Sequence, residues 1–305
     1  MRALITGGAG FVGSNLALDL QDKGHDTVVL DDFSSGNFKN LLGYEGDVVS
    51  DSILDVDLYK FKDVDVIFHQ AAITDTTVSD QKLMMQINTD GFRRLLDFAV
   101  ENDIKFIYAS SAATYGDAKS PQKEEYAGKP NNIYGFSKWI CDCIAKKYME
   151  KYPNSHIVGL RYFNVFGPRE QYKGKMASMV WQLAKQMVDG KNPRIFKWGE
   201  QKRDQVYVKN IVQINLLALD AKESCIVNAG SGNAVSFNHI IEVLNNVLGF
   251  DYEPEYIDNP YEEFYQDFTQ ADLTNAKKYL DYEPKWNFED AVKDYVEWLK
   301  DNRYI

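Results

Sequence analysis

The sequence predicts an α/β fold: a doubly wound parallel sheet with a smaller, interleaved α/β domain. Three observations lead to this prediction. Short apolar runs alternate with helical patterns in the first half of the chain, a glycine-rich turn follows the first run, and the pattern becomes less regular after residues 167–170. Strands that are separated by helices form parallel sheets with right-handed crossovers. We therefore expect a sheet domain at 1–167 and a substrate domain at 168–305, with 204–228 as a candidate segment to return to the sheet.

Short apolar runs bounded by turn residues predict the strands, and apolar residues at helical spacing predict the helices. In the first part the predicted strands lie at 2–6, 27–30, 45–49, 65–70, 105–110 and 157–163. One predicted helix follows the glycine-rich turn and ends at Asp22, and another covers 83–102. In the second part we expect helices at 176–189, 211–220, 237–248, 273–280 and 288–300, and extended segments at 194–197, 205–208 and 225–228.

Composition excludes several classes of function. The net charge of −11 argues against nucleic acid or an anionic membrane as the partner. The apolar runs are shorter than a membrane span and the chain starts directly in a predicted strand, so we expect neither a signal peptide nor a transmembrane helix. The cysteines, Cys141, Cys143 and Cys225, are interpreted as reduced thiols of a cytoplasmic protein. Cys141 and Cys143 face different ways on a helix, so no metal site is predicted.

One segment reverses the overall charge. Residues 161–203 contain ten Lys or Arg and only three acids, which gives a local net charge of +7. A solvated basic face is the simplest interpretation. Because the cations alternate with Asn, Gly and aromatic residues, the segment also suits a site for a phosphorylated small molecule.

A glycine motif lies between the first predicted strand and the first helix, with the sequence Gly7-Gly8-Ala9-Gly10-Phe11-Val12-Gly13. Gly7 permits the tight turn, Gly10 lets the backbone approach a pyrophosphate, and Gly13 packs the helix against the strand. The following helix directs its N-terminus at the anion. Asp31 closes the second strand 18 residues after Gly13, where a carboxylate holds the adenosine ribose. This arrangement predicts a Rossmann-type dinucleotide site.

The acids at the end of the second strand favour NAD over NADP. Asp31 and Asp32 would repel a 2′-phosphate. Lys39 is the nearby cation that would partly offset this repulsion.

Tyr134 and Lys138 are four residues apart and share one face if the segment is helical. A lysine ammonium beside a tyrosine hydroxyl stabilises the phenolate, so the pair predicts a base that works near neutral pH. The pattern alone has low specificity in a chain with 19 tyrosines.

Four motifs together resemble those of the extended short-chain dehydrogenase/reductase family: the glycine motif, His69-Gln70-Ala71-Ala72, Tyr108-Ala109-Ser110-Ser111-Ala112-Ala113-Thr114-Tyr115-Gly116, and the pair Tyr134 and Lys138. Three later stretches are similar to the ADP-L-glycero-D-manno-heptose 6-epimerases within it: Arg161-Tyr162-Phe163-Asn164-Val165-Phe166-Gly167-Pro168-Arg169-Glu170, Lys173-Gly174-Lys175-Met176-Ala177-Ser178, and Phe268-Thr269-Gln270-Ala271-Asp272-Leu273-Thr274.

The resemblance implies a homo-oligomeric enzyme with tightly bound NAD or NADP and a small-molecule nucleotide sugar as substrate. These epimerases invert C6 of an ADP-heptose by oxidising it to a ketone and returning the hydride to the other face. The resemblance assigns the two acid/base roles to Tyr134 and Lys173, although most lysines in such loops are solvated. It further implies that Lys138 lowers the Tyr134 pKa and binds the nicotinamide ribose, and that Ser111 hydrogen-bonds the reacting oxygen.

Further positions match ligand contacts of the family. Matches to cofactor contacts are Gly7, Gly10, Phe11, Val12, Gly13, Asp31, Asp32, Lys39, Gln70, Ala71, Ala72, Ile73, Thr74, Asn88, Tyr134, Lys138 and Val165. Matches to the nucleotide-sugar site are Ser111, Asn164, Lys175, Gln182, Phe196, Lys197, Arg203 and Tyr265. Arg203 suits a diphosphate clamp, because a guanidinium binds phosphate in two places, and a salt bridge with Asp204 is the alternative.

Two other functions are open. One is another enzyme of the family acting on a UDP-, GDP- or dTDP-sugar, such as a 4-epimerase, a dehydratase or a reductase. Dehydratases of the family carry Thr-Asp-Glu near Ser111, where this chain has Ala112-Ala113-Thr114. The other is a non-catalytic dinucleotide-sensing module, which the retained Tyr134 and Lys138 disfavour.

Overall fold

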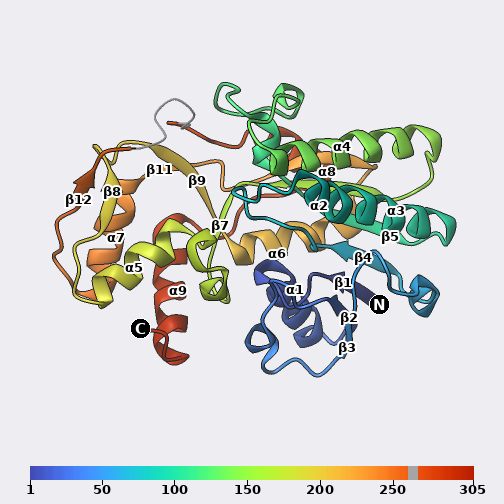
Figure 1. Cartoon of the computed structure of the whole chain (residues 1–305), viewed down its shortest axis with the longest axis horizontal. Coiled ribbons are helices and arrows are strands. Elements are labelled where there is room, and N and C mark those ends of the chain that lie inside the picture. The colour runs from blue at the N-terminus through green and yellow to red at the C-terminus, as the bar shows by residue number, and fades with distance from the viewer. Residues whose placement is uncertain (260–266) are drawn as a thin grey trace.

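A seven-stranded parallel sheet dominates the computed structural model, which describes residues 1–259 and 267–305 (Figure 1). From edge to edge its strands are β10 (Cys225–Ala229), β6 (Ile157–Tyr162), β5 (Lys105–Ser111), β4 (Val66–His69), β1 (Arg2–Thr6), β2 (Asp26–Asp31) and β3 (Asp47–Ser50). The chain leaves β1 first toward β3 and then, from β4 on, toward the opposite edge. The sheet therefore has its topological switch point between β1 and β4, where ligands bind at the carboxyl ends of such strands. The fold is Rossmann-like, as predicted.

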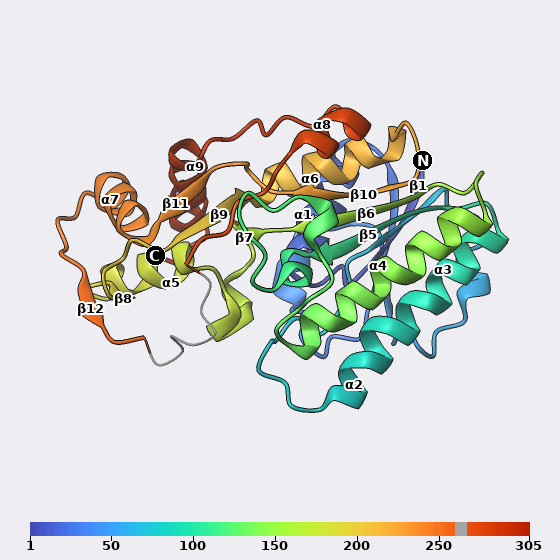
Figure 2. The same ribbon diagram turned by 90° about the horizontal axis from the view of Figure 1, so that it is seen from above.

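Helices cover both faces of the sheet (Figure 2). One face carries α1 (Phe11–Asp22), α6 (Val208–Leu217) and α8 (Thr274–Leu280), and the other carries α3 (Gly91–Glu101) and α4 (Ile133–Lys151). Successive residues of a strand point to opposite faces. In β1, Ile5 packs in the core that contains Leu16 of α1, and Leu4 packs in the core that contains Phe92 of α3.

A third core lies beside the sheet, on the left of Figure 1. It is formed by α5 (Met179–Val188), α7 (Phe237–Leu248) and α9 (Phe288–Asp301). Short strands accompany these helices: β7 (Asn164–Phe166), β9 (Lys202–Tyr207) and β11 (Ala234–Ser236) form one sheet, and β8 (Arg194–Phe196) pairs with β12 (Glu255–Ile257). Phe11 at the start of α1 belongs to this third core, whereas Leu16 of the same helix belongs to the core on one face of the sheet. These two cores therefore meet at α1, directly after the glycine turn.

Two predicted helices differ from the structure. The helix predicted at 83–102 is α2 (Gln81–Met85), a π-helical turn (Gln86–Asp90) and α3. The turn contains Asn88, whose side chain bonds the neighbouring loop and α4. The helix predicted at 176–189 begins at Met179, because the Ser178 hydroxyl caps it by accepting from the Trp181 amide at 3.2 Å.

Among the described helices, none has the length and the apolar character that crossing a membrane requires.

Candidate active site

Tyr134 and Lys138 lie in the first two turns of α4, with their helix fixed against the end of β5. Asn132 caps the helix, since its side-chain oxygen accepts from the Gly135 amide at 2.8 Å. Lys138 is 3% exposed, and its ammonium donates to the Ala109 carbonyl of β5 at 2.8 Å. The structure thus brings the two residues onto the face of α4 that covers the sheet, as their spacing predicts.

Burial dominates the electrostatics of this pair. It raises the pKa of Tyr134, and a hydrogen bond from Ser111 partly opposes the rise. Burial also lowers the pKa of Lys138, which the nearby Cys141 and Asp142 oppose. The expectation that Lys138 brings the Tyr134 pKa down toward neutral is therefore wrong for this structure, because desolvation of the phenolate outweighs its favourable contacts. Ser111 lies at the end of its strand, β5, as predicted, and it contacts Tyr134.

Lys173 lies in a 3₁₀ turn, Gln171–Met176, between β7 and α5. Its ammonium is 5.4 Å from the centre of the Phe11 ring, in the first turn of α1. Burial lowers the pKa of Lys173, and the carboxylate of Glu170 opposes this shift. The lysine is thus half-buried beside the cofactor helix rather than solvated.

The glycine turn has the shape that a dinucleotide pyrophosphate requires. Gly7 has a φ of +67°, and a Cβ there would lie 2.6 Å from the Ala71 amide nitrogen. A Cβ on Gly13 would collide with the Gly7 carbonyl. Gly10 precedes α1 without a side-chain cap, so the first amides of the helix are open to an anion. The residues present therefore fit a dinucleotide.

Asp31 fixes the end of this turn. Its Oδ2 accepts from the Ala9 amide at 2.9 Å and its Oδ1 from the Phe33 amide at 2.8 Å. Burial raises the pKa of Asp31, and these two bonds oppose the shift. Asp32 is exposed and accepts from the Ser34 amide at 2.9 Å. Lys39 lies 5.8 Å from the centre of the Tyr172 ring.

The loop of residues 70–74 follows β4, and Asn88 clamps it. Asn88 is 1% exposed; it accepts from the Ile73 amide at 2.8 Å and donates to the Ser137 hydroxyl of α4 at 3.0 Å. The Gln70 side chain accepts from Tyr162 at 3.0 Å and donates to Asn215 at 3.2 Å. Both side chains thus tie the loop to its neighbours, while the backbone of Ala71 approaches Gly7.

Of the residues predicted for the sugar nucleotide, Ser111 lies on β5 of the large sheet, and the other described ones lie between β7 and β9. Asn164 is exposed and Val165 half-buried on β7, next to the end of β6. Lys175 donates to Thr77 at 3.4 Å. Gln182 donates to the Ala177 carbonyl at 2.7 Å. Phe196 is half-buried on β8, and Lys197 forms an ion pair with Asp258 at 2.6 Å. Arg203 lies on β9 and donates to the Lys202 carbonyl at 2.9 Å. Tyr265 lies outside the described residues.

The alternative role of Arg203, a salt bridge with Asp204, is not what the contacts of Asp204 show. Asp204 is fully buried, and it accepts from Ser231, Gly232 and the Ala271 amide at 2.7 to 3.0 Å. Its role is to hold the turn after β10.

The basic segment is less available to a phosphate than its charge predicts. Arg161 is 1% exposed and pairs with Asp142 of α4 at 2.9 Å. Its guanidinium also donates to the Tyr115 hydroxyl at 3.1 Å. Asp142, which sequence reasoning missed, further accepts from Tyr108 of β5 at 2.9 Å. A signal for it existed, since Asp142 follows Lys138 by one helical turn on the same face.

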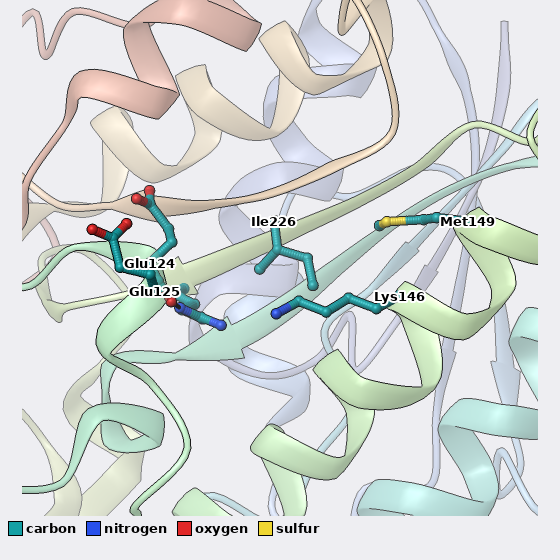
Figure 3. Close-up of a pocket in the computed structure, with 6 residues that line it drawn as sticks. Glu124, Glu125, Lys146, Met149 and Ile226 are labelled. Atoms are coloured by element: carbon teal, nitrogen blue, oxygen red, sulfur yellow. Dashed lines mark hydrogen bonds between the residues drawn. The ribbon is translucent and has the colours of Figure 1, made fainter.

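The structure also contains a hollow of about 310 Å³. Its lining residues are Glu124, Glu125, Lys146, Met149, Arg161 and Ile226 (Figure 3), and none of them is a predicted site residue. Lys146 and Met149 extend from α4 toward Ile226 of β10.

Comparison with known proteins agrees with the fold and the motifs. Residues 3–230 match the model of the NAD dependent epimerase/dehydratase family. The chain is similar to ADP-L-glycero-D-manno-heptose-6-epimerase from Helicobacter pylori, with 42% identity, a TM-score of 0.91, and coverage of 98% of this chain and 96% of that one. It is also similar to UDP-N-acetylglucosamine 4-epimerase from Methanobrevibacter ruminantium M1 in complex with UDP-N-acetylmuramic acid, with 30% identity, a TM-score of 0.92, and coverage of 99% and 98%.

A third similar structure is the UDP-glucose 4-epimerase from Thermus thermophilus in complex with NAD, with 25% identity, a TM-score of 0.86, and coverage of 98% of this chain and 99% of that one. The family match covers well over half of the chain, and the glycine turn, Tyr134 and Lys138 fall within it. The chain belongs to the NAD dependent epimerase/dehydratase family, part of the extended short-chain dehydrogenases/reductases.

Proposed function

We propose that this nucleotide-sugar epimerase inverts C6 of an ADP-glycero-manno-heptose. The observation that carries the proposal is the placement of Lys173 beside Phe11, which gives the site an ionisable group on a different element from Tyr134. Inversion at one carbon needs acid/base groups on two sides, or one group and a substrate that turns over. The 42% identity to the H. pylori heptose epimerase supports the choice of sugar.

Burial acts on the two groups in opposite directions, because it disfavours the charged form of each. It raises the pKa of Tyr134 and lowers that of Lys173, and each group can exchange a proton with the sugar. The glycine turn and Asp31 would hold a nicotinamide dinucleotide, which would supply reversible hydride transfer at C6. Tyr134 and Lys173 then take the proton of the C6 hydroxyl from one epimer and return a proton to the oxygen of the other. Ser111 orients that oxygen beside Tyr134. NAD is the preferred dinucleotide, because Asp31 and Asp32 oppose a 2′-phosphate.

The runner-up substrate is a UDP-sugar, which the 30% identical 4-epimerase binds. The test is to incubate the purified protein with ADP-glycero-manno-heptose and with UDP- and GDP-hexoses in separate reactions, and to follow the sugar protons by NMR. We expect inversion at C6 of the ADP-heptose. Inversion of a UDP- or GDP-sugar with no change in the ADP-heptose would overturn the assignment.

A further inference from the structure

Two residues before the turn that carries Lys173, the chain has unusual backbone geometry. Arg169 has a φ of +74°, in the left-handed region. A residue with a Cβ loses about 1 kcal/mol or more in that region, so the conformation persists where other contacts fix it. Arg169 is not among the residues predicted for the site, and its contacts explain what fixes it.

The Arg169 side chain connects the turn to α1 and to the loop that contains Asn40. Its Nε donates to the Asn40 carbonyl at 3.1 Å, and its Nη1 donates to the Asn15 side-chain oxygen at 3.3 Å. Asn15 lies on α1 and donates in turn to the Pro168 carbonyl at 2.9 Å and to the Phe11 carbonyl at 2.8 Å. The same helical turn that presents Phe11 to Lys173 is thus bonded to the residue that precedes Arg169.

The Arg169 guanidinium also reaches the C-terminal helix. It lies 5.6 Å from the centre of the Trp298 ring of α9. Trp298 stacks on Tyr304, with the ring centres 5.5 Å apart. The Tyr304 hydroxyl is 2.8 Å from that of Tyr172, the neighbour of Lys173 in the chain. Two contacts from one aromatic cluster therefore hold the turn on both sides of residues 170–171.

Glu170 closes the turn from within. Its fully buried carboxylate accepts from the Gly167 amide at 3.0 Å and from the Ser178 amide at 2.6 Å. Its carbonyl accepts from the Lys173 amide at 2.9 Å. The turn is consequently closed at both ends, and the bonds of Arg169 connect it to α1 and to the loop that contains Asn40.

We propose that Arg169 is a positioning residue that holds Lys173 over the Phe11 ring, and that Trp298 and Tyr304 support it. The effect of Arg169 on the rate of epimerisation rests on the proposed function, whereas its effect on the order of the turn does not. The two are tested separately.

Hydrogen exchange tests the mechanical part without substrate. In Arg169→Met we expect the amides of Lys173 and Ala177, which bond the carbonyls of Glu170 and Gly174, to exchange about tenfold faster than in the wild type. The Phe136 amide, bonded to Asn132 at the start of α4, should exchange at the wild-type rate. The matched control is Arg194→Met, an exposed arginine paired with Glu255. Unchanged exchange at Lys173, or an equal increase at Phe136, would overturn the proposal.

Kinetics test the catalytic part on whichever nucleotide sugar the wild type epimerises. We expect Arg169→Met to lower kcat by at least about tenfold with KM within about twofold, because the loss concerns a proton-transfer group and not uniform binding. Arg169→Lys should restore part of the rate. Unchanged kcat in a variant with a loosened turn would refute positioning. A wild type that epimerises no nucleotide sugar would refute the proposed function and leave the exchange result standing.

Discussion

The Lys173 ammonium lies 5.4 Å from the centre of the Phe11 ring, directly after the glycine turn. Tyr134 reaches the same edge of the sheet from α4, through Ser111 at the end of β5. The proposed site therefore combines Tyr134 from the helix that covers the large sheet with Lys173 from the turn between β7 and α5. Each of the following predictions tests one piece of this arrangement.

Tyr134→Phe and Lys173→Met should each abolish epimerisation, by at least about 100-fold in kcat, since each removes one proton-transfer group. The measurement is NMR of the sugar protons at saturating substrate, with circular dichroism to confirm that the fold is intact. Tyr59→Phe is the matched control, because Tyr59 is 77% exposed. Normal turnover in Lys173→Met would remove that lysine from the mechanism.

The apo-protein should bind NAD at least about tenfold more tightly than NADP. The 2′-phosphate of NADP would be repelled by the carboxylates of Asp31 and Asp32. A tenfold difference in Kd corresponds to about 1.4 kcal/mol of binding free energy. Titration calorimetry with both dinucleotides measures the ratio. Asp32→Asn, which keeps the size of the side chain, should narrow it. Tighter binding of NADP than of NAD would contradict the prediction.

Arg161→Met should lower the free energy of unfolding by about 3 to 5 kcal/mol, because it leaves the Asp142 carboxylate buried without its partner. Urea denaturation monitored by fluorescence gives this value. The matched variant Arg194→Met removes an exposed pair with Glu255 and should cost less than about 1 kcal/mol. Similar losses in the two variants would show that the buried pair has no special weight.

His69 should make the protein less stable in acid. It is 2% exposed and bonded to Thr6 at 2.8 Å, and burial, with the Lys138 charge, lowers its pKa to about 3. Below its ordinary value of 6.5 the unfolded chain takes up a proton that the native protein refuses, so stability falls as the pH drops from 6.5 toward 3.

The slope of this loss is up to about 1.4 kcal/mol per pH unit. His69→Phe has no imidazole to titrate and so lacks this pH dependence. The difference in free energy of unfolding between wild type and variant should therefore shrink by about 1 kcal/mol between pH 7.5 and pH 5.5. Urea denaturation at the two pH values checks this. A constant difference would mean that the pKa of His69 is the same in the native and unfolded states.

Local patterns sufficed for the sheet and the glycine turn, because strand runs and the constraints on Gly7 and Gly13 are set by nearby residues. They did not suffice where distant partners decide. The π-helical turn at Asn88 depends on contacts with Ile73 and Ser137. Arg161 contributes to the basic segment in the sequence but is neutralised by Asp142, which another element supplies. The direction of the Tyr134 pKa depends on burial, which the spacing to Lys138 does not report.

The position of β10 at the edge of the sheet has a consequence for folding during synthesis on the ribosome. β6 pairs with β5 on one side and with β10 on the other, and β10 lies more than sixty residues later in the chain. Until Ala229 has emerged, β6 is an open edge, with apolar side chains such as Val158 and Leu160 awaiting partners in their core. Unpaired edges of this kind promote association between nascent chains. Strands β1 to β6 can thus assemble early, while the sheet is completed only after β10 has been synthesised.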